Sequence, residues 1–209
     1  PRRTAPKEER QLQLVRATIR SVAAHGLSDT TMATVASTAG LSQGIINLHF
    51  RSKQRLLVAT LRHLADEYRA GWEQAVAKAG ADPADRLAAR VAADFAPLVC
   101  HRDKLAVWFA FWGESKSRPT YRRICAERDR ADREAIVTLC RALIRHGGYA
   151  DIDADTVAAT LSAMTAGLWI DLLMRPRTID RGQAHAICTA YLAATFTRHF
   201  PRPEPGATR

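Results

Sequence analysis

The sequence is poor in aromatic residues and in cysteine. Aromatics make up 7% of the 209 residues, and the cysteines include no C-x-x-C pair and no histidine at metal-ligand spacing. Scattered cysteines of this kind are typical of buried thiols in a reducing cytosol, so neither a metal site nor a bound cofactor is expected. The four are Cys100, Cys125, Cys140 and Cys188.

Signals for a membrane or for catalysis are also missing. No signal peptide is visible, and no apolar run approaches the about 18 residues that a membrane span requires. The chain has no H-E-x-x-H, no glycine-rich phosphate loop and no G-x-S-x-G, and its seven histidines are dispersed. We therefore expect a cytoplasmic protein that does not contact a membrane and is not an enzyme.

Helical periodicity, by contrast, runs along almost the whole chain. The composition is 47% hydrophobic, which excludes a disordered protein, and no alternating strand pattern or repeat interrupts the helical spacing. Aspartates that cap helices and glycines or prolines that end them separate the segments. The sequence predicts an all-α fold of nine helices, at residues 11–24, 32–39, a short helix from 43, 53–79, 83–96, 102–117, 120–146, 154–174 and 181–200.

Positive charge is concentrated in the first third of the chain. Residues 1–62 carry ten Lys and Arg against three Asp and Glu, whereas the other residues hold 21 against 18. A basic region of this kind attracts a polyanion and makes its affinity salt-dependent. A merely soluble basic surface would have the same composition, so charge alone does not decide between them.

The segment from Thr30 to Lys53 predicts a helix-turn-helix. Thr31 can cap its first helix, Gly40 supplies the left-handed residue that ends it, and Ser42 caps a second helix that begins at Gln43. Two short helices joined around a glycine place the second in the DNA major groove. The residues left to pack inward are Leu41, Ile45, Ile46 and Phe50.

The last two helices are apolar on more than one side. Small residues such as Ala163, Gly167 and Ala190 would let neighbouring backbones approach closely. These helices are either interior helices of a monomer or the interface with a second copy, and a homodimer through them is expected because two recognition helices can then engage two half-sites. The expected domains are 1–52 for DNA, 53–200 for effector binding and dimerisation, and a flexible tail at 201–209, with a frayed start at 1–10.

The N-terminal motifs resemble the tetracycline-repressor (TetR) family of DNA-binding regulators over roughly residues 10–58. The matching positions are Gly26, Thr30-Thr31, Val35-Ala36, Ala39-Gly40-Leu41-Ser42, Gly44, His49-Phe50, Lys53 and Leu56-Leu57. The resemblance implies a homodimeric repressor with a three-helix DNA-binding domain, a double-stranded DNA operator and a small-molecule effector. The DNA-binding residues that it implies are Thr31, Ser42, Gln43, Gly44, Asn47, Leu48, His49 and Lys53.

Their chemistry agrees with that role. Gln43 and Asn47 can read base edges by hydrogen bonds, Gly44 permits close approach, and Thr31 and Lys53 suit phosphate. Many members of the family carry aromatic residues where this chain has Asn47 and Leu48. Packing against the next helix is the alternative for His49.

The stretches GIINLHFRSK, WFAFWGES and SAMTAGLWIDLL resemble a narrower branch, the betaine regulators (BetI), which release DNA when choline is present. A quaternary ammonium binds well to aromatic faces with a nearby carboxylate. The candidate effector-binding residues are therefore Trp108, Phe111, Trp112, Trp169 and Asp171.

Other interpretations stay open at this point. The aromatic stripe can be ordinary core, and Asp171 can pair with an arginine across the dimer. The chain could also be a helical protein-interaction adaptor, or a TetR-type regulator of an unrelated pathway with a different apolar effector.

Overall fold

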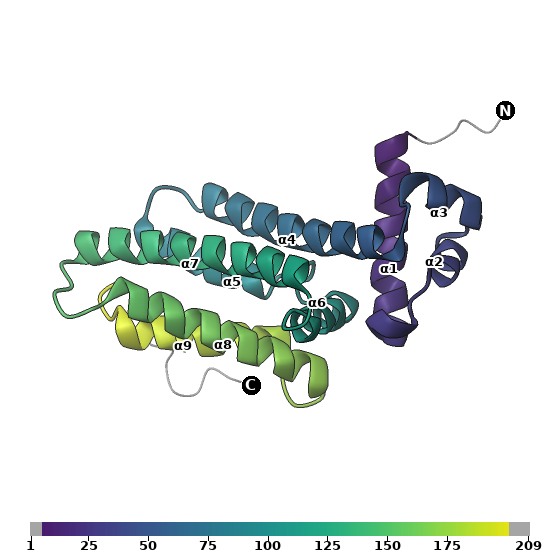
Figure 1. The fold of residues 1–209 in the computed structure, drawn as a ribbon. Helices are drawn as coiled ribbons and strands as arrows, with labels where there is room; N and C mark the ends of the chain where they lie inside the picture. The colour runs from purple at the N-terminus through teal and green to yellow at the C-terminus, as the bar shows by residue number, and fades with distance from the viewer. Residues whose placement is uncertain (1–5, 201–209) are drawn as a thin grey trace. The chain divides into compact units, whose positions relative to one another are not determined.

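The computed structural model describes residues 6–200, and every regular element in that range is an α-helix (Figure 1). The all-α prediction is therefore confirmed. The helices are α1 (Lys7–Asp29), α2 (Met32–Ala39), α3 (Gln43–His49), α4 (Lys53–Lys78), α5 (Pro83–Asp94), α6 (Arg102–Glu114), α7 (Pro119–Gly147), α8 (Ala154–Met174) and α9 (Arg181–Thr195). The expected tail at 201–209 lies outside the described residues, as does the first half of the expected frayed start.

The chain forms two compact units. Within the described residues, the first consists of residues 6–67 and Arg102–Glu127, and the second of Tyr68–His101 and residues 128–200. Two helices, α4 and α7, therefore contribute residues to both units. The expected domain boundary after residue 52 stays a prediction.

One hydrophobic core holds the first unit together. Helix α1 packs against both α2 and α6, so the core of the helix-turn-helix continues into α6. Leu14 of α1, Ile46 of α3, Leu61 of α4 and Phe111 of α6 have no exposed surface in this cluster. Burying four such side chains stabilises the unit by about 1.5–3 kcal/mol each, before the cost of ordering the chain.

The second unit is built on α5, α8 and α9. Both α5 and α8 pack against α9, and Leu87, Val91, Leu161 and Leu192 are buried there. Asp82, Asp153 and Asp180 accept hydrogen bonds from the first turns of α5, α8 and α9, as the sequence predicts. Satisfied caps explain why these three helices begin where they were expected to.

Several helix ends differ from the sequence prediction, among them the ends of α5 and α6, which lie at Asp94 and Glu114 instead of at 96 and 117. Helix α1 starts at Lys7 rather than Gln11, because the charged turn Lys7–Arg10 continues the helix without adding an apolar residue. Gly26, with φ 78°, still interrupts α1 at the expected stop. Helix α9 ends at Thr195, five residues earlier than predicted, and Phe196 and Phe200 are buried in the turn that follows.

Helix α8 also corrects the expectation about apolar length. It is the one helix among residues 6–200 that is long and apolar enough to cross a membrane by length and composition. Buried core helices pass the same test. Leu161, Leu168 and Trp169 on α8 are buried inside the second unit, whereas Ile170 and Met174 on the same helix are exposed.

Candidate functional site

The turn between α2 and α3 is fixed by its own hydrogen bonds. Thr31 and Thr34 form a capping box at the start of α2, in which the Thr34 N–H donates to Thr31 Oγ1 at 3.1 Å. Gly40 has φ 67°, and the Leu41 N–H donates to the Ala36 carbonyl at 2.9 Å. The predicted caps and the left-handed glycine are therefore confirmed, and they set the direction in which α3 leaves the turn.

Two side chains of α1 donate hydrogen bonds to the last carbonyl groups of α2. Gln13 Nε2 donates to the Ala39 carbonyl at 2.9 Å, and Arg20 Nη2 donates to the Thr38 carbonyl at 3.1 Å. The last carbonyls of a helix have no partner within it, so these two bonds satisfy groups that would otherwise need water. They also tie the helix-turn-helix to α1.

Helix α3 has an anchored face and an open face. Ile46 is completely buried and Phe50, which follows α3, is 7% exposed, while Leu41 and Ile45 are half-buried. The opposite face is exposed, and Leu48 on it shows 80% of its surface. An apolar side chain that protrudes this far suits contact with another surface, such as the methyl groups of a DNA groove. The exposed residues of this segment include Ser42, Gln43, Gly44, Asn47 and Leu48.

The other predicted DNA-binding residues lie around this face. Thr31 is exposed at the start of α2, and His49 is half-buried at the end of α3. Lys53 Nζ donates to the Ser28 carbonyl at 2.8 Å, so this ammonium is held beside the end of α1. Arg51 and Arg55 are exposed on either side of Lys53 and add positive charge to the same stretch.

The candidate effector residues on α6 have three different environments. Phe111 is buried and makes an edge contact with Tyr121, with ring centroids 5.0 Å apart. Trp108 is half-buried against the core of the first unit, and Trp112 is 50% exposed, with its ring near that of Phe109. Ordinary packing accounts for Phe111, whereas the exposure of Trp112 is unusual for so large an aromatic.

The two candidates on α8 also differ from each other. Trp169 is buried in the second unit, and its Nε1 donates to the Asp94 carbonyl at 2.9 Å. Asp171 is partly exposed and forms an ion pair with Arg175 one turn later in the same helix. The structure thus gives the polar residue in LWIDLLM a local partner, which the i, i+4 spacing of the two residues could have indicated.

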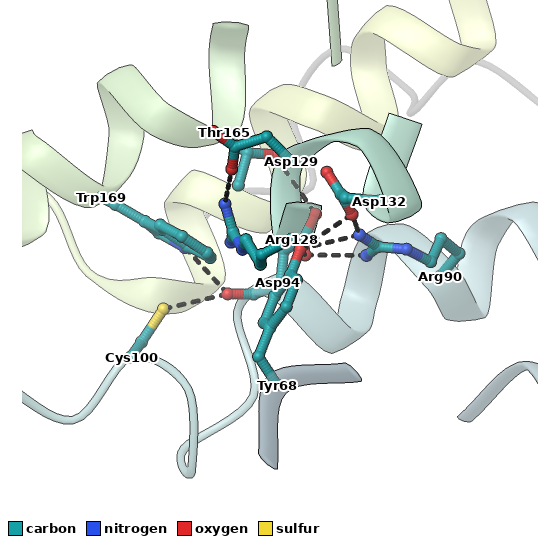
Figure 2. Close-up of polar contacts among 9 residues, drawn as sticks. All are labelled: Tyr68, Arg90, Asp94, Cys100, Arg128, Asp129, Asp132, Thr165 and Trp169. Carbon is teal, nitrogen blue, oxygen red and sulfur yellow. Dashed lines mark hydrogen bonds and ion pairs between the residues drawn. The ribbon is translucent and has the colours of Figure 1, made fainter. Parts of the chain in front are cut away.

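Beside Trp169 lies a buried group of charges that the sequence analysis missed (Figure 2). We call it the polar cluster; its members are Tyr68, Arg90, Asp94, Arg128, Asp132, Thr165 and Trp169. Arg90 has no exposed surface, and its Nη1 donates to Asp94 Oδ1 at 2.7 Å. Its Nη2 pairs with Asp132 and donates to the Tyr68 hydroxyl at 2.7 Å.

Hydrogen bonds from three helices converge on Asp94. Tyr68 Oη lies 2.7 Å from Asp94 Oδ1 and 3.0 Å from Asp132 Oδ1, so its one proton can serve either carboxylate. Thr165 donates to Asp94 Oδ2 at 3.3 Å. Cys100 Sγ and Trp169 Nε1 both donate to the Asp94 carbonyl. This one residue therefore organises side chains of α4, α5 and α8.

Burial and neighbouring charges shift the pKa values of Tyr68 and Arg90 in the cluster. It raises the pKa of Tyr68, and Asp94 adds to that effect, so the phenol keeps its proton at neutral pH. Burial alone would lower the pKa of Arg90, but Asp94 and Tyr68 outweigh it and the pKa is raised. Burial also raises the pKa of the Cys100 thiol to about 12. Tyr68 and Arg90 therefore both keep their protons at neutral pH.

A signal for the cluster was present in the sequence. Arg90 and Asp94 stand at the third and seventh positions after Leu87, with Val91 between them, so they occupy the apolar face of α5. Charged residues at core positions are expected to be paired inside the protein. Arg90 Nε is the one buried side-chain polar atom within residues 6–200 that has no hydrogen-bond partner.

Comparisons with known proteins match both the N-terminal and the C-terminal part of the chain. Residues 14–60 match the family described as bacterial regulatory proteins, tetR family, and residues 83–197 match the BetI-type transcriptional repressor C-terminal family. The HTH-type transcriptional regulator BetI of Burkholderia thailandensis is 36% identical over 191 residues, covering 82% of this chain and 96% of that protein. The regulator of the same name from Serratia proteamaculans is 32% identical, covering 92% of this chain and 95% of that protein.

Solved structures show the same fold. A transcriptional regulator from Pseudomonas aeruginosa PAO1 superposes with a TM-score of 0.81 at 28% identity, covering 94% of this chain and 96% of that chain. A regulator from Saccharomonospora viridis in complex with choline gives a TM-score of 0.77 at 26% identity, covering 88% and 96%. These relatives are regulators and not enzymes, as predicted. The chain belongs to the TetR family of transcriptional regulators and carries a BetI-type C-terminal domain.

Proposed function

We propose that this regulator is a cytoplasmic repressor that binds a palindromic operator as a homodimer and leaves it when a small-molecule effector binds. The observation that carries the proposal is the open face of α3, which exposes Gln43, Gly44, Asn47 and Leu48 while Ile46 and Phe50 anchor the helix. A helix anchored on one side and free on the other can enter a major groove without unfolding its own domain.

Each exposed residue has a proposed role. Gln43 and Asn47 read base edges, and Gly44 lets the helix backbone come close to the DNA. Leu48 and His49 contact the groove or its rim. Thr31, Ser42 and Lys53 lie at helix starts, where side chains and free backbone N–H groups can hold phosphates. Each of these three residues begins or caps a helix of the first unit.

The second copy is proposed to bind to α8 and α9. Ile170 (40% exposed), Met174 (71%) and Ile187 (44%) form an apolar strip on these helices, beside an open groove lined in part by Ala163 and Gly167. Large apolar side chains gathered on one surface mark an interaction site. The inner faces of the same helices are already buried in the chain's own core, so the strip remains for a partner.

For the effector we propose a quaternary ammonium compound, with choline as the first candidate and genes of glycine betaine synthesis as the regulated ones. The regulator from Saccharomonospora viridis provides support, since it was solved in complex with choline. Trp169 offers an aromatic face, and the neighbouring Tyr68 and Asp94 add a second ring and a carboxylate. Trp108, Phe111 and Trp112 of the first unit, and Asp171 of the second, remain predicted effector residues.

Effector binding can release DNA only if it favours a state with a different spacing of the two recognition helices. Helix α4 is the proposed transmitter, because it contributes residues to both units. A tilt of α4 would move Lys53 at its start, and with it the bond to Ser28 beside the helix-turn-helix.

The test is fluorescence anisotropy with a palindrome from the gene's own upstream region and a random duplex, at the same physiological salt. We expect the palindrome to bind two chains per duplex, at least 100-fold more tightly than the random duplex. Gln43→Ala and Asn47→Ala should each cost about 1–3 kcal/mol on the palindrome and little on random DNA. Gln74→Ala, an exposed glutamine of α4 in the second unit, is the control. Equal affinity for the two duplexes would refute the repressor, and a protein adaptor would form no two-to-one complex.

A further inference from the structure

The polar cluster contains an aromatic corner that already holds a cation. The rings of Tyr68 and Trp169 meet almost at right angles, with an interplanar angle of 86° and centroids 5.8 Å apart. The guanidinium carbon of Arg128 lies 4.2 Å from the centroid of Tyr68 and 5.2 Å from that of Trp169. Both distances are within the about 6 Å at which a cation is attracted to a ring face. Figure 2 shows the three side chains together.

Both rings of this corner are fixed by hydrogen bonds. Trp169 is held through Nε1 by the Asp94 carbonyl at 2.9 Å, and Tyr68 is held through its hydroxyl by Asp94, Asp132 and Arg90. A ring that is bonded at its polar end keeps its face in place when the cation in front of it changes. The corner is therefore preorganised for a cation, whichever cation occupies it.

Charges in the cluster are close to balanced as it stands. Asp94 and Asp132 are buried, and Arg90 and the mostly buried Arg128 supply two positive charges against them. A further cation placed against the same rings would face the guanidinium of Arg128 at close range in a region of low dielectric constant, where like charges repel strongly. A cation could enter at no such cost only if Arg128 left.

We propose that Arg128 is an internal occupant of the cation site, and that an organic cation must displace its side chain from Tyr68 and Trp169 in order to bind. This deepens the proposed function and rests on the effector being a cation. Asp129 gives the displaced guanidinium somewhere to go, because it already accepts from Arg128 Nη1 at 2.8 Å and is itself half-exposed.

Because of the position of Arg128 in the chain, displacement of its side chain would affect the two helices that contribute to both units. Tyr68 and Arg128 are the first residues of the second unit on α4 and α7, the two helices that contribute to both units. Moving the Arg128 side chain removes an interaction that joins α7 to α4 at that point. The binding of a cation is thereby linked to the packing of these two helices.

The experiment compares cation binding by the full chain and by Arg128→Ala. Calorimetry with tetramethylammonium chloride, and with choline chloride, is expected to give affinities at least tenfold tighter for Arg128→Ala, because the competitor has been removed. The melting temperature of Arg128→Ala should also rise with tetramethylammonium more than with sodium chloride at equal ionic strength. Arg133→Ala removes an exposed arginine from the same helix and should behave like the unmodified protein.

Two further variants keep the result decisive. Arg128→Ala combined with Trp169→Ala should lose the gain, because one ring of the corner is gone. If Arg128→Ala does not fold, the Arg128 Nε–H signal in the unmodified protein, assigned with Arg128→Lys, should shift as tetramethylammonium is added.

Equal affinities for the unmodified protein and Arg128→Ala, or an Arg128 signal that stays unchanged while the cation binds, would overturn the occupancy and leave a choline effector intact. Tight tetramethylammonium binding by Arg128→Ala with no effect of choline on operator binding would support the occupancy and refute the proposed effector. No binding of either cation to any variant would overturn the occupancy itself.

Discussion

Replacing Tyr68 by Phe tests whether the polar cluster holds the second unit together. The substitution keeps the buried ring and its contact with Trp169, and removes only the hydroxyl. That hydroxyl accepts from Arg90 Nη2 at 2.7 Å and lies 2.7 Å from Asp94 Oδ1. A hydrogen bond to a charged group contributes about 1.5–3 kcal/mol, and Arg90 keeps its ion pairs in the variant, so we expect a loss of about 2–4 kcal/mol in the free energy of unfolding.

The assay is urea denaturation followed by circular dichroism at one fixed protein concentration, since a dimer's stability depends on concentration. Tyr121→Phe is the matched control. Its ring is equally buried, but its hydroxyl makes only a 3.4 Å contact with Gln54, so its loss should be below about 1 kcal/mol. If Tyr68→Phe cost no more than Tyr121→Phe, the hydroxyl would be solvated in solution and the cluster would not be the closed network described above.

Three further predictions concern the first unit. Gly40→Ala should destabilise the protein by about 1–2 kcal/mol, because alanine is strained at the left-handed φ of 67° that Gly40 adopts. This backbone strain is the whole expected cost, since an added Cβ would clash with no other atom. Gly44→Ala, at a helical position with ordinary contacts, should leave stability unchanged or slightly raised and weaken operator binding; both are checked by urea denaturation and anisotropy. Burial lowers the pKa of His63 below 6.5, so below that pH the unfolded chain takes up a proton that the folded chain does not. The free energy of unfolding should therefore fall as the pH drops from 6.5 towards the lower folded pKa, and His63→Gln should flatten that slope; an unchanged slope would contradict the assignment.

The fold could be predicted because its signals are local. The aspartate caps, Gly26 and Gly40, and the apolar spacing of each helix are read within one or two turns of the chain. The helix ends that differ from the prediction depend on contacts with residues farther away in the chain. The sequence predicts that the last helix runs up to Pro201, but the chain turns after Thr195 and buries Phe196 and Phe200.

Of the two candidate sites, one could be predicted from local sequence and the other could not. The exposed positions of α3 follow from its caps and its period, and for that reason the sequence could propose them. The polar cluster joins side chains from α4, α5, α7 and α8, and the partners of Arg90 lie up to 42 residues away, so no local pattern pairs them. Asp171 interrupts an apolar run, which makes it conspicuous in the sequence, whereas Asp94 is less conspicuous although it lies on the buried face of α5.

The most direct measurement of the central claim is operator affinity as choline is added at constant ionic strength. The account predicts that the dissociation constant of the palindromic duplex rises at least tenfold for the unmodified protein. It also predicts that Trp169→Ala binds the duplex normally without choline and no longer responds to it. An operator affinity that stays constant while calorimetry shows choline bound to the protein would contradict the account.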